Sequence, residues 1–300
     1  MYKQRQRSYI TSIPSLFDYL SYIFHISGSL TGPVIFYREY METIEGKRSN
    51  SLHLQSRLTH ALLRTFSGFL LLLLYAYLDS LTNISHLASE ESSTWSFLHY
   101  MLYVYICGFI SRMKYHGTWK ISEGVCIVNG FGYQGKDEHG NDQWNGILNT
   151  NMIASETATN LSYFTRNWNI RTQQWLQRYV YQRTNGSLFC LYLVSAFWHG
   201  FYPGYYIFFL TMGAAQYVGR MYNQKVYSRL HEHPSLMFIY NVLAFLATQF
   251  YLSVYCCCFF LMSYNNSVAI MNHTFWMGYI LLFIGYLIIL FVPAVKEKSK

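Results

Sequence analysis

Long apolar segments separated by shorter polar ones dominate the pattern along the chain. The clearest apolar segment, at 59–78, contains five consecutive leucines. About 20 apolar residues in a helix are enough to cross the hydrocarbon core of a bilayer. By the same criterion we predict spanning helices at 95–113, 236–262 and 274–293. The pattern therefore predicts an all-α, polytopic membrane protein.

The segments between and before these spans are less regular. Residues 15–37 predict an amphipathic, aromatic helix that is closed by Gly32-Pro33 and lies at the membrane interface or re-enters it. Residues 41–57 are polar and basic and predict a cytosolic loop, whereas residues 79–93 predict an acidic, serine-rich loop.

Residues 114–187 make up the longest polar interval. Within it, Gly130-Phe-Gly-Tyr-Gln-Gly135 has the spacing of a dinucleotide-binding fingerprint. No strand–helix–strand pattern surrounds it, so we interpret it as a tight loop. A helical period follows at 165–181, and its aromatic face is typical of a helix lying on a membrane surface. That face carries Trp168, Thr172, Trp175 and Tyr179.

Residues 188–222 are apolar but interrupted, and they contain a histidine, His199. Gly200 and the pair Pro203-Gly204 predict a break between two helices directly after it. Irregular backbone at membrane depth is tolerated where it is buried in protein or lines a cavity, so the break predicts a cavity at His199. An ionisable side chain at this depth is interpreted as functional, although a neutral, hydrogen-bonded core histidine would explain the same pattern.

The composition supports a membrane protein. Hydrophobic residues make up 52% of the chain and charged residues only 12%, whereas about 25% charged is usual in soluble domains. The net charge is +8, but the basic residues are scattered among loops and segment ends. The absence of a basic stripe argues against nucleic-acid binding. The tail Lys296-Glu-Lys-Ser-Lys300 favours a cytosolic C-terminus and also resembles a dibasic retrieval signal for the endoplasmic reticulum.

The six cysteines predict no metal site. Cys256, Cys257 and Cys258 are consecutive within an apolar run, and the others are isolated along the chain. Neither arrangement has the spacing of metal ligands.

Two motifs are similar to the signature of the membrane-bound O-acyltransferase (MBOAT) family. They are Trp168-Asn-Ile-Arg-Thr-Gln-Gln-Trp175 and Ser195-Ala-Phe-Trp-His-Gly-Phe-Tyr-Pro-Gly-Tyr-Tyr206. Their details resemble the lysophospholipid acyltransferase branch, above all its members that act on lysophosphatidylethanolamine and lysophosphatidylserine. The resemblance extends over 30–40, 122–133 and 137–144 and covers nearly the whole chain. It implies an MBOAT-like helical bundle with broken helices around a central cavity.

The resemblance also implies a reaction and a catalytic pair. A fatty acyl group moves from acyl-CoA, the co-substrate, to the free hydroxyl of a lysophospholipid in a multi-pass protein of the endoplasmic reticulum, surrounded by membrane lipid and without a bound cofactor. The motif histidine and asparagine of the family correspond to His199 and Asn169. The candidate substrate-binding residues are the aromatic residues of one motif and the arginines of the other. They are Trp198, Tyr202, Tyr205, Tyr206, Arg171 and Arg178.

Other interpretations stay open at this point. The two arginines could contact phospholipid headgroups as readily as coenzyme A phosphates. Broken helices and a buried histidine also occur in transporters, although this chain has no inverted repeat. A protein O-acyltransferase of the same superfamily and an inactive scaffold fragment are further alternatives. The sequence predicts no oligomeric state.

Members of this branch are longer, because several more membrane helices precede the part that matches here. Only 29 residues precede Leu30 in this chain. We therefore expect residues 1–300 to form a single MBOAT-like membrane domain that lacks the family's first helices. This would make the chain a C-terminal portion, a truncated gene product or an isoform. Within it, 114–187 would be the polar, interfacial segment with the Asn motif, and 188–222 would carry the His motif.

Overall fold

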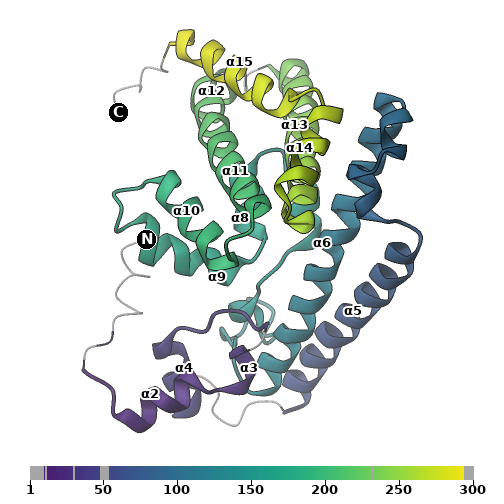
Figure 1. Ribbon diagram of the computed structural model, residues 1–300. Helices are drawn as coiled ribbons and strands as arrows, with labels where there is room; N and C mark the ends of the chain where they lie inside the picture. Colours follow the sequence, from purple (N-terminus) through teal and green to yellow (C-terminus); the bar gives the residue numbers. More distant parts are fainter. Residues whose placement is uncertain (1–9, 11, 30, 48–53, 231–232, 294–300) are drawn as a thin grey trace. The chain divides into compact units, whose positions relative to one another are not determined.

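The computed structural model describes most of the chain (Figure 1). The residues outside the description are 1–9, 11, 30, 48–53, 231–232 and 294–300. The predicted retrieval signal at 296–300 lies among them. The described residues are mostly helical and contain no β-strand, only an isolated bridge between Lys136 and Asp142. The all-α prediction is therefore confirmed.

Contacts divide the chain into two units, each assembled from separate stretches of sequence. Unit 1 consists of Met1–Ala76, Met113–Met152 and Asn167–Trp175, and unit 2 of Tyr77–Arg112, Ile153–Arg166 and Leu176–Lys300. Asn169 belongs to unit 1 and His199 to unit 2. We describe each unit by itself.

The helices that contribute to unit 1 are short near the N-terminus and long afterwards. In chain order they are α2 (Leu16–Ile23), α3 (Ile26–Ser29), α4 (Tyr37–Ile44), α5 (Leu54–Ser80), α6 (Phe97–Val128), the 3-10 turn η3 (Asn145–Ile147) and α9 (Ile170–Leu176). The last residues of α5 and of α9 and the first half of α6 belong to unit 2. Ser15 caps α2 by accepting a hydrogen bond from the Asp18 N–H.

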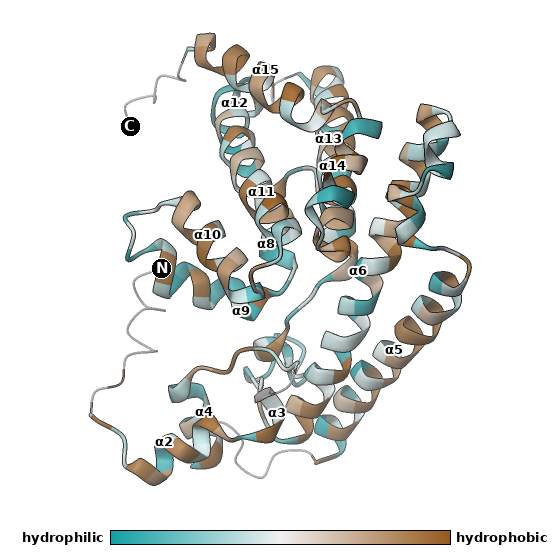
Figure 2. Ribbon diagram, viewed as in Figure 1, coloured by the Kyte–Doolittle hydropathy of each residue, from teal (hydrophilic) through white to brown (hydrophobic). Residues whose placement is uncertain are grey.

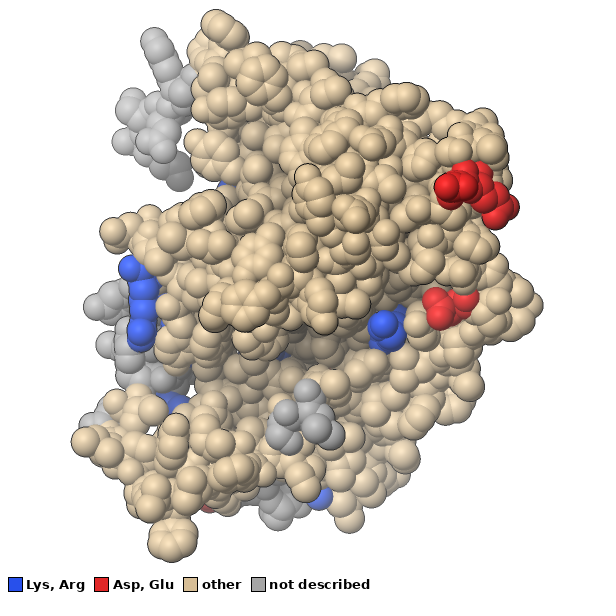
Figure 3. Space-filling model, viewed as in Figure 1, with Lys and Arg blue, Asp and Glu red and all other residues tan. Residues whose placement is uncertain are grey.

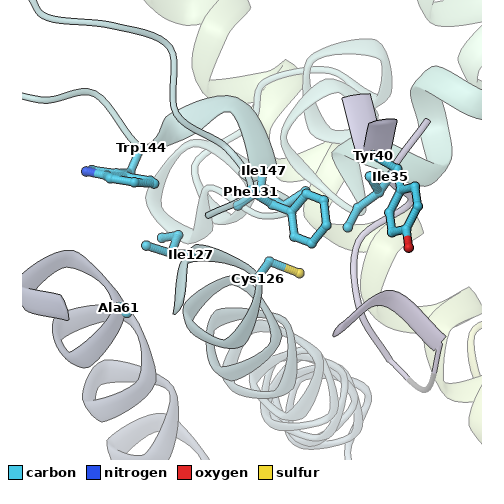
Figure 4. Close-up of a cluster of buried hydrophobic side chains, with 8 residues drawn as sticks. All are labelled: Ile35, Tyr40, Ala61, Cys126, Ile127, Phe131, Trp144 and Ile147. Carbon is cyan, nitrogen blue, oxygen red and sulfur yellow. The ribbon is translucent and has the colours of Figure 1, made fainter. Parts of the chain in front are cut away.

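The core of unit 1 forms where the end of α6 and the loop after it meet α4 and α5. Eight buried side chains make up this cluster (Figure 4): Ile35, Tyr40, Ala61, Cys126, Ile127, Phe131, Trp144 and Ile147. The loop is the glycine-rich stretch at 130–135, in which three glycines have positive φ. It is a turn that covers the core, as the sequence predicts, and not a nucleotide-binding fingerprint.

Unit 2 is built mainly from helices of the C-terminal half. They are α10 (Leu188–His199), α11 (Pro203–Tyr222), α12 (Ser228–Leu230), α13 (Pro234–Leu261), α14 (Tyr264–His273) and α15 (Met277–Phe291), with π-helical turns η4 (Gln177–Tyr181) and η5 (Asn223–Tyr227). Shorter elements precede them: η1 (Ile84–Ala88), η2 (Glu91–Thr94), α7 (Met152–Glu156) and α8 (Leu161–Asn167). The three consecutive cysteines are buried in α13, so they pack in the interior.

Two helices of the described chain are long and apolar enough to cross a membrane, α5 and α13. This confirms the spans predicted at 59–78 and 236–262. The ribbon of α5 is largely coloured as hydrophobic (Figure 2). Most of its apolar residues are exposed, as expected of a lipid-facing helix. The view in Figure 3 likewise shows a surface with few charged residues. These features fit a surface that contacts lipid.

The other two predicted spans differ from the structure. The segment at 274–293 contains one helix, α15, but at 15 residues it is shorter than the predicted span, and a bend of 69° separates it from α14 before it. The helix predicted at 95–113, which we expected to end at the basic residues Arg112 and Lys114, continues to Val128 as α6. Arg112 is buried and forms an ion pair with Glu156, 2.8 Å from nitrogen to oxygen, so it is not an anchor at a helix end.

The N-terminal segment is also more broken than its pattern suggests. The helix expected over 15–37 ends at Ile23, and α3 adds a single turn before extended residues lead into α4. The polar stretch that begins at Tyr37 is itself helical. Within α4, Glu39 caps the first turn by accepting from the Phe36 N–H at 3.2 Å.

Candidate active site

The Asn motif does not continue the helix before it. The sequence predicts one helix over 165–181, but α8 ends at Asn167 and α9 begins at Ile170. Between them Asn169 has a φ of 47°, in the left-handed region. Asparagine is one of the few non-glycine residues that adopt this conformation readily. The predicted continuous helix is therefore wrong, and the break falls at the motif asparagine itself.

Asn149 fixes the position of Asn169 within unit 1. Asn149 is completely buried, and its carbonyl oxygen accepts the Ile170 N–H at 2.8 Å. Its side-chain oxygen accepts the Arg171 N–H at 3.0 Å. Its Nδ2 group donates to the Asn169 Oδ1 atom at 3.3 Å. This last bond occupies the amide oxygen of Asn169 and leaves its Nδ2 group as the donor to offer.

Glu123 in turn holds Asn149. Its side chain is 1% exposed, and Oε1 accepts the backbone N–H groups of Asn149 at 2.8 Å and Thr150 at 3.2 Å. Its other oxygen, Oε2, accepts a hydrogen bond from Arg64 Nη1 at 3.2 Å. A buried carboxylate needs such partners to offset its lost hydration. We did not predict Asn149 or Glu123 from the sequence. The available signal was a glutamate next to the apolar stretch 125–128.

Trp168 is held by rings from α6. Its centroid lies 5.8 Å from Tyr115, 5.0 Å from His116 and 4.9 Å from Trp119. The His116 ring also hydrogen-bonds to Thr150 Oγ1. Trp168 therefore packs inside unit 1, before the break, and does not share a helical face with the residues of α9.

Arg171, a candidate substrate contact in the sequence, has a structural role inside unit 1, and its contact with a coenzyme A phosphate or a lipid headgroup stays a prediction. Its Nε group donates to the Val34 carbonyl at 2.8 Å, and Nη1 donates to the Gly146 carbonyl at 3.3 Å. Nη2 forms an ion pair with Glu39. Since the guanidinium is buried and its three nitrogens all have partners inside unit 1, it ties α4 to the Asn motif. Arg178, in η4 of unit 2, stays a predicted substrate contact.

His199 is the last residue of α10 in unit 2; its side chain is exposed, and four aromatic rings lie beside it. The centroid distances are 5.1 Å to Trp198, 5.8 Å to Tyr205, 5.0 Å to Phe209 and 5.2 Å to Phe259. No residue of the described chain hydrogen-bonds to its ring, which does not support the interpretation as a hydrogen-bonded core histidine. The cavity expected at His199 stays a prediction.

Two glycines explain the chain path beside His199. Gly200 ends α10 with a φ of 124°, which L side chains rarely adopt. Pro203 then occupies the first position of α11, where proline is favoured. A Cβ on Gly204 would lie 2.3 Å from the Cys258 carbonyl oxygen. The missing side chain thus lets α11 start against the end of α13, and the predicted break is confirmed.

The aromatic residues of the His motif fall into two groups. Trp198 and Tyr202 are exposed, whereas Tyr205 and Tyr206 are half-buried. Tyr205 packs 4.6 Å from Phe259 and its hydroxyl approaches Met262 Sδ at 3.4 Å. Tyr205 therefore belongs to the wall around His199, and the substrate contacts of all four stay predictions.

Comparison with known proteins decides the family. The sequence profile of the membrane-bound O-acyltransferase family matches residues 1–261. The chain belongs to this family. The resemblance in the two motifs is thereby confirmed, and so is the interpretation as a helical membrane protein, because two described helices could cross a bilayer.

Individual relatives of the family point to one branch. Human membrane-bound glycerophospholipid O-acyltransferase 2 is 29% identical over 97% of this chain and 58% of the relative. Lysophospholipid acyltransferase 6 of Drosophila melanogaster is 27% identical over 89% of this chain and 40% of its own length. Lysophospholipid acyltransferase of Schizosaccharomyces pombe is 28% identical over 94% of this chain and 59% of its own length. The chain thus spans about three fifths of two of these relatives and less of the third.

Proposed function

We propose that the chain carries the acyl-transfer centre of a lysophospholipid acyltransferase. The observation that supports this most is the match to the family over residues 1–261, which includes both motifs with their histidine and asparagine intact. The names of the relatives supply the proposed substrate class, a lysophospholipid acceptor. Acyl-CoA is the proposed donor, with no bound cofactor, and the endoplasmic reticulum is the proposed location.

His199 is the proposed general base. A hydroxyl is a weak nucleophile until a base accepts its proton, and a neutral imidazole can do this near neutral pH. The acceptor oxygen then attacks the thioester carbonyl carbon, and the carbon–sulfur bond breaks as the carbonyl re-forms. The imidazolium returns its proton to the departing thiolate, so the products are the acylated phospholipid and free coenzyme A. No cysteine nucleophile is required.

Asn169 is the proposed partner of the negative charge that develops on the thioester oxygen. Its Oδ1 atom is occupied by Asn149, so the group available to a substrate is the Nδ2 donor. A fixed donor of this kind lowers an acyl-transfer barrier by about 3–4 kcal/mol. The buried network around Asn149 supports this role because it pre-orients the amide.

The test is acyl transfer in microsomes from cells that express this chain. Oleoyl coenzyme A is supplied with a panel of lysophospholipids, and His199→Ala is compared with His86→Ala, which changes an exposed histidine in η1. We expect headgroup-selective product in the wild type and in His86→Ala, and none in His199→Ala. Equal product in His199→Ala and wild type would refute the base. No product from a stably inserted wild-type chain would refute the claim that this chain carries the centre.

A further inference from the structure

Unit 2 contains a cavity of about 660 Å³ at the beginning of α10, beside the second half of α11 and η4. Most of its wall is apolar, and the apolar residues that line it include Leu188, Phe189, Leu210, Ala214 and Met221. Its volume is in the range of sites that bind small molecules. Walls of this kind accept an aliphatic chain.

One cation lines this cavity, Arg220 of α11. Its Nη1 group donates to the Tyr181 hydroxyl at 3.1 Å, and Nε donates to Ser162 Oγ at 3.4 Å. Its guanidinium carbon also lies 5.7 Å from the centre of the Tyr181 ring. These are neutral partners, and no carboxylate in the described part of the chain forms an ion pair with Arg220. Its positive charge is therefore not neutralised within unit 2.

A buried hydrogen-bond network fixes the position of Arg220. Gln216 lies one helical turn before it, and the Gln216 Nε2 group donates to the same Ser162 Oγ at 3.0 Å. The Tyr192 hydroxyl of α10 donates to the Gln216 side-chain oxygen. Tyr192 and Gln216 are buried. The guanidinium is thus held at the cavity wall by Tyr181 of η4 and Ser162 of α8, and a ligand would bind it without ordering a long side chain.

The cavity opens to the exterior of unit 2. Three of the residues that line it, Phe189, Ala214 and Tyr217, are exposed. An apolar cavity with an open side and one cation fits an amphiphile whose aliphatic chain enters the cavity and whose anionic group pairs with the guanidinium. Arginine suits phosphate oxygens in particular, because its planar fork donates two parallel hydrogen bonds.

We propose that this cavity binds one acyl chain of a membrane phospholipid, with the lipid phosphate on Arg220. The site is separate from the proposed base. Leu188 lines the cavity at the first turn of α10, and His199 ends the same helix eleven residues later. At 1.5 Å per residue the two positions are about 16 Å apart. Tyr192, which also lines the cavity, lies seven residues before His199, about 10 Å along the helix. The proposal places the lipid at the Leu188 end of the cavity, away from the proposed base.

Native mass spectrometry of the purified chain tests this site. The protein is released from detergent after incubation with dioleoyl phosphatidic acid, dioleoylglycerol, inorganic phosphate or oleoyl coenzyme A. We expect phosphatidic acid to remain bound and dioleoylglycerol and inorganic phosphate to bind far more weakly. Arg220→Gln should lower phosphatidic acid binding about tenfold, the effect of losing charge-assisted hydrogen bonds. Arg229→Gln, which removes donors to backbone carbonyls, is the matched control.

A second pair of variants tests the apolar part of the cavity. Ala214→Leu adds bulk to its wall, whereas Gly219→Leu adds the same side chain to α11 where a Cβ has no neighbour within 4 Å. Lipid binding should fall in the first variant alone, with thermal unfolding midpoints showing that both fold. Unchanged binding in both Arg220→Gln and Ala214→Leu would overturn the proposal. So would displacement of phosphatidic acid by oleoyl coenzyme A, since the cavity would then belong to the acyl donor.

Discussion

Asn169 and His199 differ in what surrounds them within their own units. Asn169 adopts a left-handed conformation and hydrogen-bonds to Asn149, which Glu123 holds in turn. His199 is exposed, with aromatic rings beside it and no hydrogen-bond partner among the described residues. A directional donor needs a fixed orientation, which a buried polar network provides. A base that must accept and release a proton needs a free ring nitrogen, which apolar packing leaves available.

The largest expected effect is on the stability of unit 1. Arg171→Gln removes the ion pair with Glu39 and leaves that carboxylate and two backbone carbonyls without their donor. Breaking such a partly buried pair should cost about 3 kcal/mol. Thermal unfolding of the purified chain measures this, with Arg183→Gln at an exposed arginine as the control. An unchanged midpoint with a raised KM for acyl-CoA would contradict the structural role and restore the phosphate contact.

The next effect is on turnover. Asn149→Asp keeps the shape and the acceptor for the Arg171 N–H, but it replaces the donor to Asn169 by a carboxylate oxygen. The Asn169 amide should then turn away, and a displacement of about 1 Å can cost about 100-fold in rate. We expect kcat to fall while the KM for acyl-CoA changes little. The control is Asn129→Asp, at an exposed amide that bonds to the Val125 carbonyl; equal kcat values in the two variants would rule out positioning by Asn149.

A somewhat smaller effect should test the packing that holds the His motif. Gly204→Ala places a Cβ 2.3 Å from the Cys258 carbonyl oxygen, so the start of α11 must shift away from α13. Overpacking of this kind costs about 2 kcal/mol. Gly219→Ala, in open space on the same helix, should leave the unfolding midpoint unchanged or raise it. If both variants unfold at the wild-type temperature, close packing at Gly204 does not position the motif.

The smallest expected effect concerns the loop of unit 1 around Asp137. Hydrogen bonds from the backbone and side chain of Asn141, from the His139 N–H and from Gln143 hold the pKa of Asp137 below its usual value. Because the folded pKa is the lower one, the stabilisation is present above the unfolded-state pKa and is lost as the pH falls through the folded pKa. Cleavage of this loop by an acid protease should rise over that acidic window. Asp137→Asn should remove the pH dependence. Equal cleavage of the wild-type loop at every pH would contradict stabilisation of the loop by the Asp137 carboxylate.

Local signals in the sequence were sufficient where a helix depends on its own residues. The apolar runs of α5 and α13 and the glycine and proline after His199 predicted their elements. The Arg112–Glu156 pair spans 44 residues, so no local pattern could show that Arg112 lies inside a longer helix. The break at Asn169 was missed for the same reason. The helical period runs through it, and the contact that holds the break comes from Asn149.

The two candidate catalytic residues came from the motifs alone, whereas their surroundings did not. Asn149 does not stand out in the sequence, and Glu123 does so only by its position next to an apolar stretch, because a single polar residue has many roles and its partners lie 20 or more residues away. The structural role of Arg171 was also hidden in the sequence, because its partner Glu39 lies far away along the chain. Its position in the motif suggests a ligand, but burial against Glu39 makes it a structural tie.

The left-handed backbone at Asn169 gives the sharpest test of the proposed mechanism. Asparagine could occupy this position only because it tolerates positive φ, without any use of its side chain. Asn169→Gly keeps the backbone conformation and removes the amide, and Asn185→Gly makes the same change at another left-handed asparagine. Acyl transfer from oleoyl coenzyme A in microsomes should fall at least 100-fold in Asn169→Gly, by the loss of an oxyanion donor, and stay unchanged in Asn185→Gly. Full activity in Asn169→Gly would show that the residue only shapes the turn, and would contradict the catalytic role of its amide.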